Sequence, residues 1–282
     1  MQNKILKKVL CYALAAAGTL ACATTMTACE TNTPEAQIVL SFNGKTYTLE
    51  YEMNRKITPK TVAHFIALAD AGYYNGLCVH NYQSTTGMYT GGYTYTDGNL
   101  VAKDYFSTVT SYIPKSVWLD SSKKTPTYTL YGEFEKNNFN VTNGALSESY
   151  GSLVMYYTSK SGGDQVSIER NDGKGMATRS YEYNSATSQF YISLAATSSK
   201  NKNYCVFATL SEDSKSALGS LQTAISDYMD DTFGEEAEEK FAESETVTVD
   251  ENDPVVGGQG VAVSYDVPRE PIIVKSVKIT KY

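Results

Sequence analysis

The chain has 282 residues, with 24 basic and 31 acidic side chains and a net charge of −7 at neutral pH. This acidic balance argues against partners such as nucleic acid or anionic lipid head groups, which basic surfaces recognise. The 23 tyrosines favour half-exposed strands, and the length suits one large β domain with insertions.

The first 28 residues have the pattern of an export signal. A basic start contains Lys4, Lys7 and Lys8, and the apolar run 9–21 that follows is too short to span a bilayer comfortably. Without residues 1–28 the net charge falls from −7 to −10, because they carry three lysines and no acid. Any tether to a membrane must therefore come from a lipid and not from a basic patch.

Residues 26–29, Met-Thr-Ala-Cys, resemble the cleavage site of bacterial lipoproteins. That resemblance implies that Cys29 becomes a diacylated N-terminus, and two acyl chains are enough for stable anchoring. Cys22 is a weaker alternative, and an ordinary secreted protein cut nearby is another. We predict a signal peptide over 1–28 and a tether over 29–35. The mature chain would be exported and lipid-anchored to the bacterial membrane, facing outside the cytoplasm.

The next segments predict a hairpin and two helices. Residues 38–42 and 47–51 alternate in polarity around Asn43-Gly44, a strong hairpin signal. We predict that Thr58 caps a helix that has Pro59 at its first position, a stripe of apolar residues at helical spacing and Gly72 at its end. A second helix is predicted from about Asp213 to Met229.

Acidic residues dominate from Asp230 to Asp253, where Lys240 is the single base. Such a run is typical of a solvated helix or mobile loop, and a specific docking site is the alternative. Residues 257–260, Gly-Gly-Gln-Gly, predict a flexible turn. They lack the strand and helix that flank a phosphate-binding loop, so we assign them no nucleotide role.

Cysteine and histidine are sparse. Once residues up to Cys29 are set aside, Cys78 and Cys205 remain, and we predict that they are buried free thiols and not a disulfide. His64 and His80 are the two histidines, and we expect packing or hydrogen-bonding roles for both. No Cys/His spacing suggests a metal site, and we expect no cofactor.

Residues 184–191, Asn-Ser-Ala-Thr-Ser-Gln-Phe-Tyr, resemble the Asn-x-x-x-Ser-Gln-Phe-Phe signature of the cyclophilins. Further segments resemble the family in the same order along the chain: Pro59-Lys60-Thr61-Val62 with Phe65, Gly72-Tyr73-Tyr74-Asn75-Gly76, Val79-His80, Gly91-Gly92, Tyr131-Gly132-Glu133-Phe134 with Asn138-Phe139, Gly151-Ser152-Leu153-Val154-Met155, Tyr204-Cys205-Val206-Phe207, and Pro271 to Val277.

The resemblance implies a mainly β fold, a closed eight-stranded antiparallel β-barrel capped by two α-helices. It assigns residues 36–282 to one domain, with loop insertions near 93–128, 159–183 and 230–266. It also implies peptidyl-prolyl cis-trans isomerase activity on proline-containing polypeptides. Rotation about a peptide bond faces a barrier of ~18–20 kcal/mol, and an isomerase must stabilise the twisted amide more than either planar form. That chemistry requires no metal or cofactor.

The resemblance also suggests the residues of the site. Asn81 stands at the position of the family's catalytic arginine, and Gln189 matches the glutamine that holds the substrate backbone. The expected substrate contacts are Met88, Thr90, Tyr156, Tyr191, Ser199 and Tyr204. On the family's pattern Asn81 and Tyr204 face the groove, whereas Cys78 and Cys205 point into the barrel.

The change from arginine to Asn81 leaves two interpretations open, because a neutral donor is weaker than a charged one. One is an isomerase of reduced activity, and Arg179 is a second candidate for the missing donor. The other is a non-catalytic, lipid-anchored module that binds a peptide or a partner protein.

Overall fold

The computed structural model describes residues 31–137, 146–157, 164–170, 173–181, 186–255 and 257–282. The predicted signal peptide with Cys22 and Cys29 lies outside the described residues, as do Asn138-Phe139, the first residues of the 184–191 signature and parts of the 159–183 insertion.

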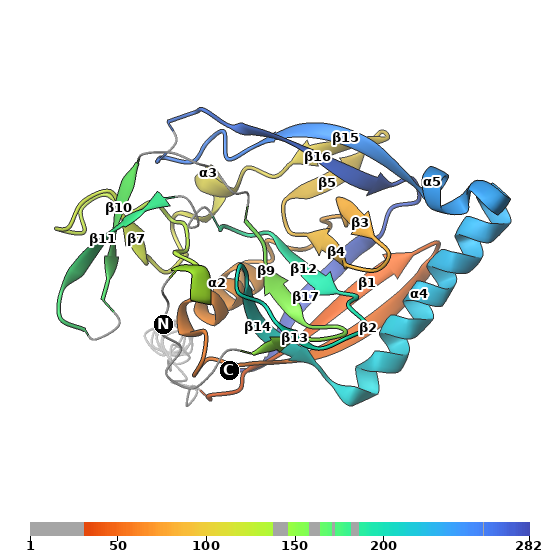
Figure 1. Cartoon of the computed structure of the whole chain (residues 1–282), viewed down its shortest axis with the longest axis horizontal. Helices are drawn as coiled ribbons and strands as arrows, with labels where there is room; N and C mark the ends of the chain where they lie inside the picture. Colours follow the sequence, from red (N-terminus) through yellow and green to blue (C-terminus); the bar gives the residue numbers. More distant parts are fainter. Residues whose placement is uncertain (1–30, 138–145, 158–163, 171–172, 182–185, 256) are drawn as a thin grey trace, which may run out of the picture. The chain divides into compact units, whose positions relative to one another are not determined.

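Eight antiparallel strands form a curled half-barrel (Figure 1). Their spatial order is β17 (Ile273–Lys281), β1 (Glu35–Phe42), β2 (Lys45–Met53), β14 (Cys205–Leu210), β9 (Leu153–Met155), β12 (Phe190–Ser193), β4 (Gly87–Thr90) and β3 (Asn81–Gln83).

The predicted closed barrel is wrong, because β3 and β17 are the two edges of this sheet. The segment before β3 approaches β17 through an isolated bridge between Cys78 and Ile273 and a few backbone bonds, such as Val79 N–H to Ile272 O at 2.8 Å. β3 has three residues and β17 has nine, so a continuous ladder between them does not form.

The first predicted hairpin is confirmed. β1 and β2 pair in register from Glu35 opposite Glu52 to Phe42 opposite Lys45. The two turn residues, Asn43 and Gly44, have φ angles of 44° and 74°. Both angles lie in the left-handed region that the tightest hairpin turns require, which explains the Asn-Gly pair.

Both predicted helices are present as α2 (Pro59–Asp70) and α4 (Glu212–Phe233). α2 packs against β14 and β17, and α4 packs against β1 and β2.

The start of α2 is held by a distant residue. The buried carboxylate of Glu133 accepts hydrogen bonds from the backbone N–H groups of Lys60 (3.1 Å) and Thr61 (2.8 Å). The predicted side-chain cap by Thr58 is wrong, because the Thr58 hydroxyl does not accept from the helix and donates to Asn54 O. No helix among the described residues has the length and apolar character needed to cross a membrane.

The insertions carry structure of their own. The first contains β5 (Tyr93–Thr96), β6 (Asn99–Ala102), α3 (Tyr105–Val109) and β7 (Val117–Trp118). β7 joins β10 (Gln165–Glu169) and β11 (Met176–Ser180) of the second insertion in a three-stranded sheet. The short strands β8 (Ser147–Glu148) and β13 (Ser199–Lys200) pair with each other. Along the chain, β8 comes just before β9 and β13 comes just before β14.

Within the acidic segment the predicted helix is confirmed for residues 230–241, whereas the prediction is wrong for residues 242–249, which form a strand. After α5 (Ala237–Phe241), the strands β15 (Ala242–Val249) and β16 (Val261–Pro268) form an antiparallel hairpin in which eight pairs of residues lie opposite each other. Glu245 points inward, and its carboxylate accepts the backbone N–H of Leu100 on β6. We call this element the β15–β16 hairpin.

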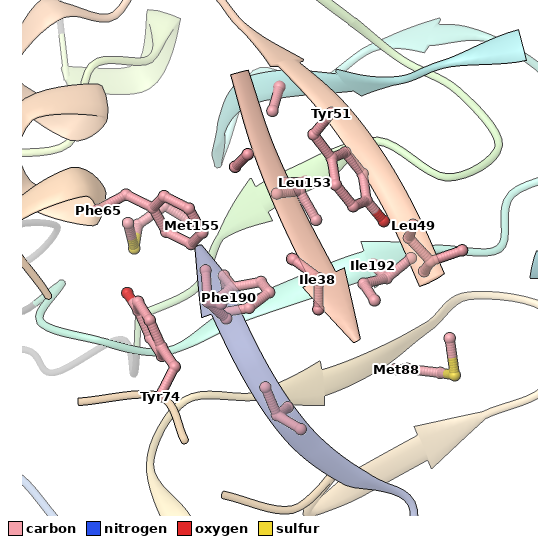
Figure 2. Packing of buried hydrophobic residues seen from close by; sticks show 14 of the residues in the cluster. Ile38, Leu49, Tyr51, Phe65, Tyr74, Met88, Leu153, Met155, Phe190 and Ile192 are labelled. Atoms are coloured by element: carbon pink, nitrogen blue, oxygen red, sulfur yellow. The ribbon is translucent and has the colours of Figure 1, made fainter. Parts of the chain in front are cut away.

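The main core lies between the curled sheet and the helices and is rich in aromatic rings (Figure 2). Phe65 of α2 meets Phe190 of β12 edge-on at 5.5 Å between ring centroids. Both cysteines are buried free thiols, as predicted. Cys205 lies in this core, whereas Cys78 packs with Tyr93 and Tyr265 beneath the β15–β16 hairpin. The prediction that Cys78 points into the barrel is therefore wrong.

Candidate functional site

A row of directly paired residues crosses the face of the sheet opposite to the core. We call it the outer row, and it consists of Asn81 on β3, Tyr89 on β4, Tyr191 on β12, Val154 on β9 and Val206 on β14. Directly paired residues share a face, and successive residues of a strand alternate between faces. The next row therefore faces the core, and Met88, Ile192 and Leu153 in that row are buried there. Asn81 lies on the same face as Tyr191, as the family pattern implies.

Four tyrosine rings dominate the outer face. Tyr89 lies 4.8 Å from Tyr191 and 5.2 Å from Tyr156 between centroids, and Tyr156 stacks on Tyr204 at 5.8 Å. Burial, followed by the neighbouring Tyr204, raises the pKa of Tyr156 to about 12. Burial also raises the pKa values of Tyr89, Tyr191 and Tyr204. All four phenols keep their protons at neutral pH and can donate hydrogen bonds.

The tip of Tyr191 is held by a small polar network. Asn201 donates its amide to the Tyr191 hydroxyl at 3.2 Å and to the carboxylate of Glu148 at 2.6 Å. Ser193 donates to the other oxygen of Glu148 at 2.8 Å. This network fixes the Tyr191 ring in one position on the face.

Gln189 reaches the same face because two glycines lie beneath it. Gly91 has a φ of 97°, and a Cβ atom there would lie 2.3 Å from the carbonyl oxygen of Ser188. The Ser188 hydroxyl donates to Gly91 O at 2.6 Å. A Cβ atom on Gly92 would meet the side chain of Gln189 at 3.0 Å. The glycine pair thus lets the signature segment approach the end of β4.

Asn81 and Gln189 both contact the β15–β16 hairpin. Asn81 is 8% exposed, and its Oδ1 accepts the backbone N–H of Asp266 at 3.0 Å. The Tyr265 hydroxyl donates to Oε1 of Gln189 at 3.4 Å. The Tyr265 ring also packs on His80 at 4.6 Å. Burial lowers the pKa of His80 to about 3, and the neighbouring Gln189 side chain partly opposes that shift, so His80 is neutral at pH 7.

Two predicted substrate contacts do not lie on this face. Met88 is fully buried in the core, where Figure 2 shows it beside Ile192. Thr90 is buried opposite Phe190, and its hydroxyl donates to Cys78 O at 2.7 Å. The family resemblance located the glycine pair after β4, but it assigned Met88 and Thr90 to the outer face of this strand, whereas both are buried on the other face. Tyr89, which the sequence analysis missed, occupies the outer face between these two residues. Tyr89 is recognised as part of the site because it lies directly opposite Tyr191 in the sheet.

Two further candidates lie outside the outer row. Ser199 is exposed on the short strand β13, opposite Glu148. Arg179 is exposed on β11, and its guanidinium donates to Thr178 O. Figure 1 shows β11 set apart from β3 and β12, so Arg179 does not take the place of the missing arginine in this arrangement.

No cluster of three His, Cys, Asp or Glu side chains within the described ranges could hold a metal ion. His64 is buried on α2, with its Nε2 2.5 Å from Thr187 O and 3.2 Å from the Tyr105 hydroxyl, and burial lowers its pKa to about 4. A cavity of about 120 Å³ lies beside Gln189, between Gly92, Lys103 and the hairpin loop at 250–252.

The family model described as cyclophilin type peptidyl-prolyl cis-trans isomerase/CLD matches residues 37–235. The chain belongs to this family. Its cyclophilin-type isomerase domain therefore contains every residue of the outer row, whereas the β15–β16 hairpin lies beyond the matched residues.

Solved structures similar to this chain include a cyclophilin-type peptidyl-prolyl cis-trans isomerase of Cryptosporidium parvum and the same protein in the presence of the dipeptide Ala-Pro. Each is 16% identical with a TM-score of 0.45; the alignments cover 89% and 88% of this chain and 99% of each of those chains. No curated protein matches the chain.

Proposed function

We propose that the protein is a peptidyl-prolyl cis-trans isomerase that acts on Xaa-Pro bonds of exported proteins and so assists their folding. Besides family membership, the observation that carries this proposal is the outer row. It brings the aromatic rings of Tyr89 and Tyr191 onto the same face as Asn81, with Gln189 at its border.

Each part of the row matches a need of the reaction. The tyrosine rings offer apolar surface for a proline ring, and their hydroxyls can donate to the flanking carbonyl groups. The Gln189 amide can hold the substrate backbone. The Asn81 amide can donate to the prolyl nitrogen, which localises the lone pair and weakens the amide resonance behind the barrier of ~18–20 kcal/mol. Because Asn81 is neutral, its bond is about half as strong as that of a charged donor. We therefore expect reduced activity.

The alternative is a non-catalytic module that binds peptides or a partner protein. One observation favours it, because Asn81 is nearly buried and already accepts a hydrogen bond from Asp266. Function depends on the site and not on the fold, so activity itself must decide between the two.

The deciding experiment is two-dimensional NMR exchange spectroscopy on an Xaa-Pro peptide with a catalytic amount of protein. Uncatalysed exchange takes tens to hundreds of seconds, so a catalysed rate stands out clearly. We expect accelerated exchange that is lost in Gln189→Leu and reduced in Tyr191→Leu. Tyr112→Leu, the same substitution as Tyr191→Leu but at an exposed tyrosine outside the row, is the matched control. Binding without faster exchange would instead support the non-catalytic module.

We also propose that the mature chain is exported and lipid-anchored through Cys29. The basic start, the apolar run and the residues before Cys29 support this. In a detergent partition the parent should enter the detergent phase and Cys29→Ser the aqueous phase. Cys22→Ser is the matched control and should behave like the parent. Identical partition of the parent and Cys29→Ser would contradict the anchor.

A further inference from the structure

The β15–β16 hairpin is held in place by apolar packing. Tyr265, Val267 and Val249 are buried against Cys78, Tyr93 and Leu100. The outward-facing residues of β16, including Ala262, Ser264 and Asp266, are exposed. The hairpin thus has one apolar face that docks on the domain and one polar face in solvent, and it lies beside β3.

Consecutive residues of β16 contact the two candidate catalytic residues. The Asp266 N–H donates to Asn81 at 3.0 Å, and the Tyr265 hydroxyl donates to Gln189 at 3.4 Å. Because the Asp266 N–H points to Asn81, it does not take part in the ladder with β15. β16 therefore presents an extended backbone and an aromatic side chain to the residues that a polypeptide substrate would need.

The loop of the hairpin borders the same region. Asp250 and Glu251 line the cavity beside Gln189 together with Lys103. Tyr265, Tyr93 and Tyr156 all lie close enough to Asp250 for its charge to raise their pKa values, after burial as the larger cause. The hairpin thus covers the border of the outer row from Asn81 to Gln189.

We propose that the β15–β16 hairpin is a built-in cover that competes with the polypeptide substrate for Asn81 and Gln189. The protein then has a covered form, which is the one described above, and an open form that binds substrate. This inference rests on the proposed function in one respect, because it assumes that a polypeptide binds at the outer row. The apparent affinity is lowered in proportion to the fraction of open molecules.

Two substitutions weaken the contacts of the hairpin with Asn81 and Gln189. Asp266→Pro removes the N–H that bonds Asn81, and a proline is tolerated on a strand where its N–H is outside the ladder. Tyr265→Phe keeps the ring and removes the hydroxyl that bonds Gln189. Ala262→Pro is the matched control, since it lies on the same strand with its N–H on the same side, four residues from Asp266.

Binding of a fluorescein-labelled Xaa-Pro peptide is measured by anisotropy for each variant, and kcat/KM is measured in parallel. We expect Asp266→Pro and Tyr265→Phe each to tighten binding about three- to tenfold, from the usual net contribution of one hydrogen bond, while Ala262→Pro matches the parent. Equal affinity in all four proteins would overturn the cover. If Asp266→Pro does not fold, Tyr265→Phe alone decides.

Amide hydrogen exchange of the parent gives an independent readout. A saturating Xaa-Pro peptide should speed exchange in 261–268, because the hairpin leaves the site. Slower exchange there would mean that the hairpin is part of the binding surface, and it would overturn the proposal. Tighter binding in the variants with no isomerase activity in any protein would keep the cover and reject the enzyme. Isomerase activity in the parent, with unchanged peptide binding in the variants, would keep the enzyme and reject the cover.

Discussion

The two faces of strands β4 and β12 carry different kinds of side chain. On the core face, Met88, Phe190 and Ile192 are buried apolar residues that pack on α2 and the opposite strands. On the outer face, Tyr89 and Tyr191 carry hydroxyl groups, and Asn81 is a neutral amide.

The difference reflects two kinds of constraint. A close-packed interior requires apolar side chains of particular volume, so the core face keeps a recognisable signature. The outer face is constrained by whatever it binds, and here also by the β15–β16 hairpin. A family match therefore establishes the fold of this chain, whereas its chemistry must be tested at the outer row.

The largest expected effect is a difference in the free energy of unfolding between substitutions on the two faces. Phe190→Ala should lower the free energy of unfolding by about 3–5 kcal/mol, because it leaves a cavity among the rings of Phe65 and Tyr74. Tyr191→Phe, the neighbouring residue on the other face, should cost about 1 kcal/mol. Urea denaturation measures both. Equal losses would show that the two faces are packed alike.

We expect low pH to destabilise the folded protein through its two buried histidines. The pKa values of about 4 for His64 and about 3 for His80 lie below the unfolded value of 6.5. The unfolded chain therefore binds protons first, and stability falls as pH decreases from 6.5 towards 4. Each histidine contributes about 1.4 kcal/mol per pH unit in that window.

His80→Phe keeps a ring between Tyr93 and Tyr265 and should make the pH dependence of the unfolding free energy shallower by that amount. The experiment compares urea unfolding at pH 7 and pH 5. An unchanged slope would mean that His80 is not held neutral beneath the hairpin.

The cap on α2 should matter for stability and not for activity. Glu133→Ala removes the acceptor of two backbone N–H groups, and we expect a loss of about 1–2 kcal/mol. Glu135→Ala is a control at an exposed site. Urea denaturation gives the stability and the peptide exchange assay gives the rate. A large fall in rate at a temperature where the variant is folded would show that α2 and the outer row are coupled.

The smallest expected effect concerns the outer face itself. Asn81→Arg should raise kcat/KM about fivefold, since a charged donor is about twice as strong as a neutral one. Asn81→Gln stays neutral and keeps an amide oxygen that can accept the Asp266 N–H, so it is the control and should show no gain. A similar gain in both would attribute the effect to the longer side chain and not to charge.

Local signals in the sequence predicted the local structure well. Asn43-Gly44 specifies its turn by backbone conformation, and the apolar stripe predicts α2 because the helix buries that face. Met88 was misplaced because its direction depends on pairing with Ile192, which is distant in sequence. The β15–β16 hairpin was missed because acidic residues obscured the alternation of β15, and the inward Glu245 finds its partner on β6.

The central claim is that a proline-containing chain binds on the outer row. The most direct test is to map backbone amide shifts in the NMR spectrum during titration with an Xaa-Pro peptide, with the Xaa-Ala peptide as the control. The largest shifts should cluster at Asn81, Tyr89, Gln189 and Tyr191, and in 261–268 of the β15–β16 hairpin, for the proline peptide alone. Shifts confined to the β7–β10–β11 sheet or to α4, or equal shifts with both peptides, would contradict the account.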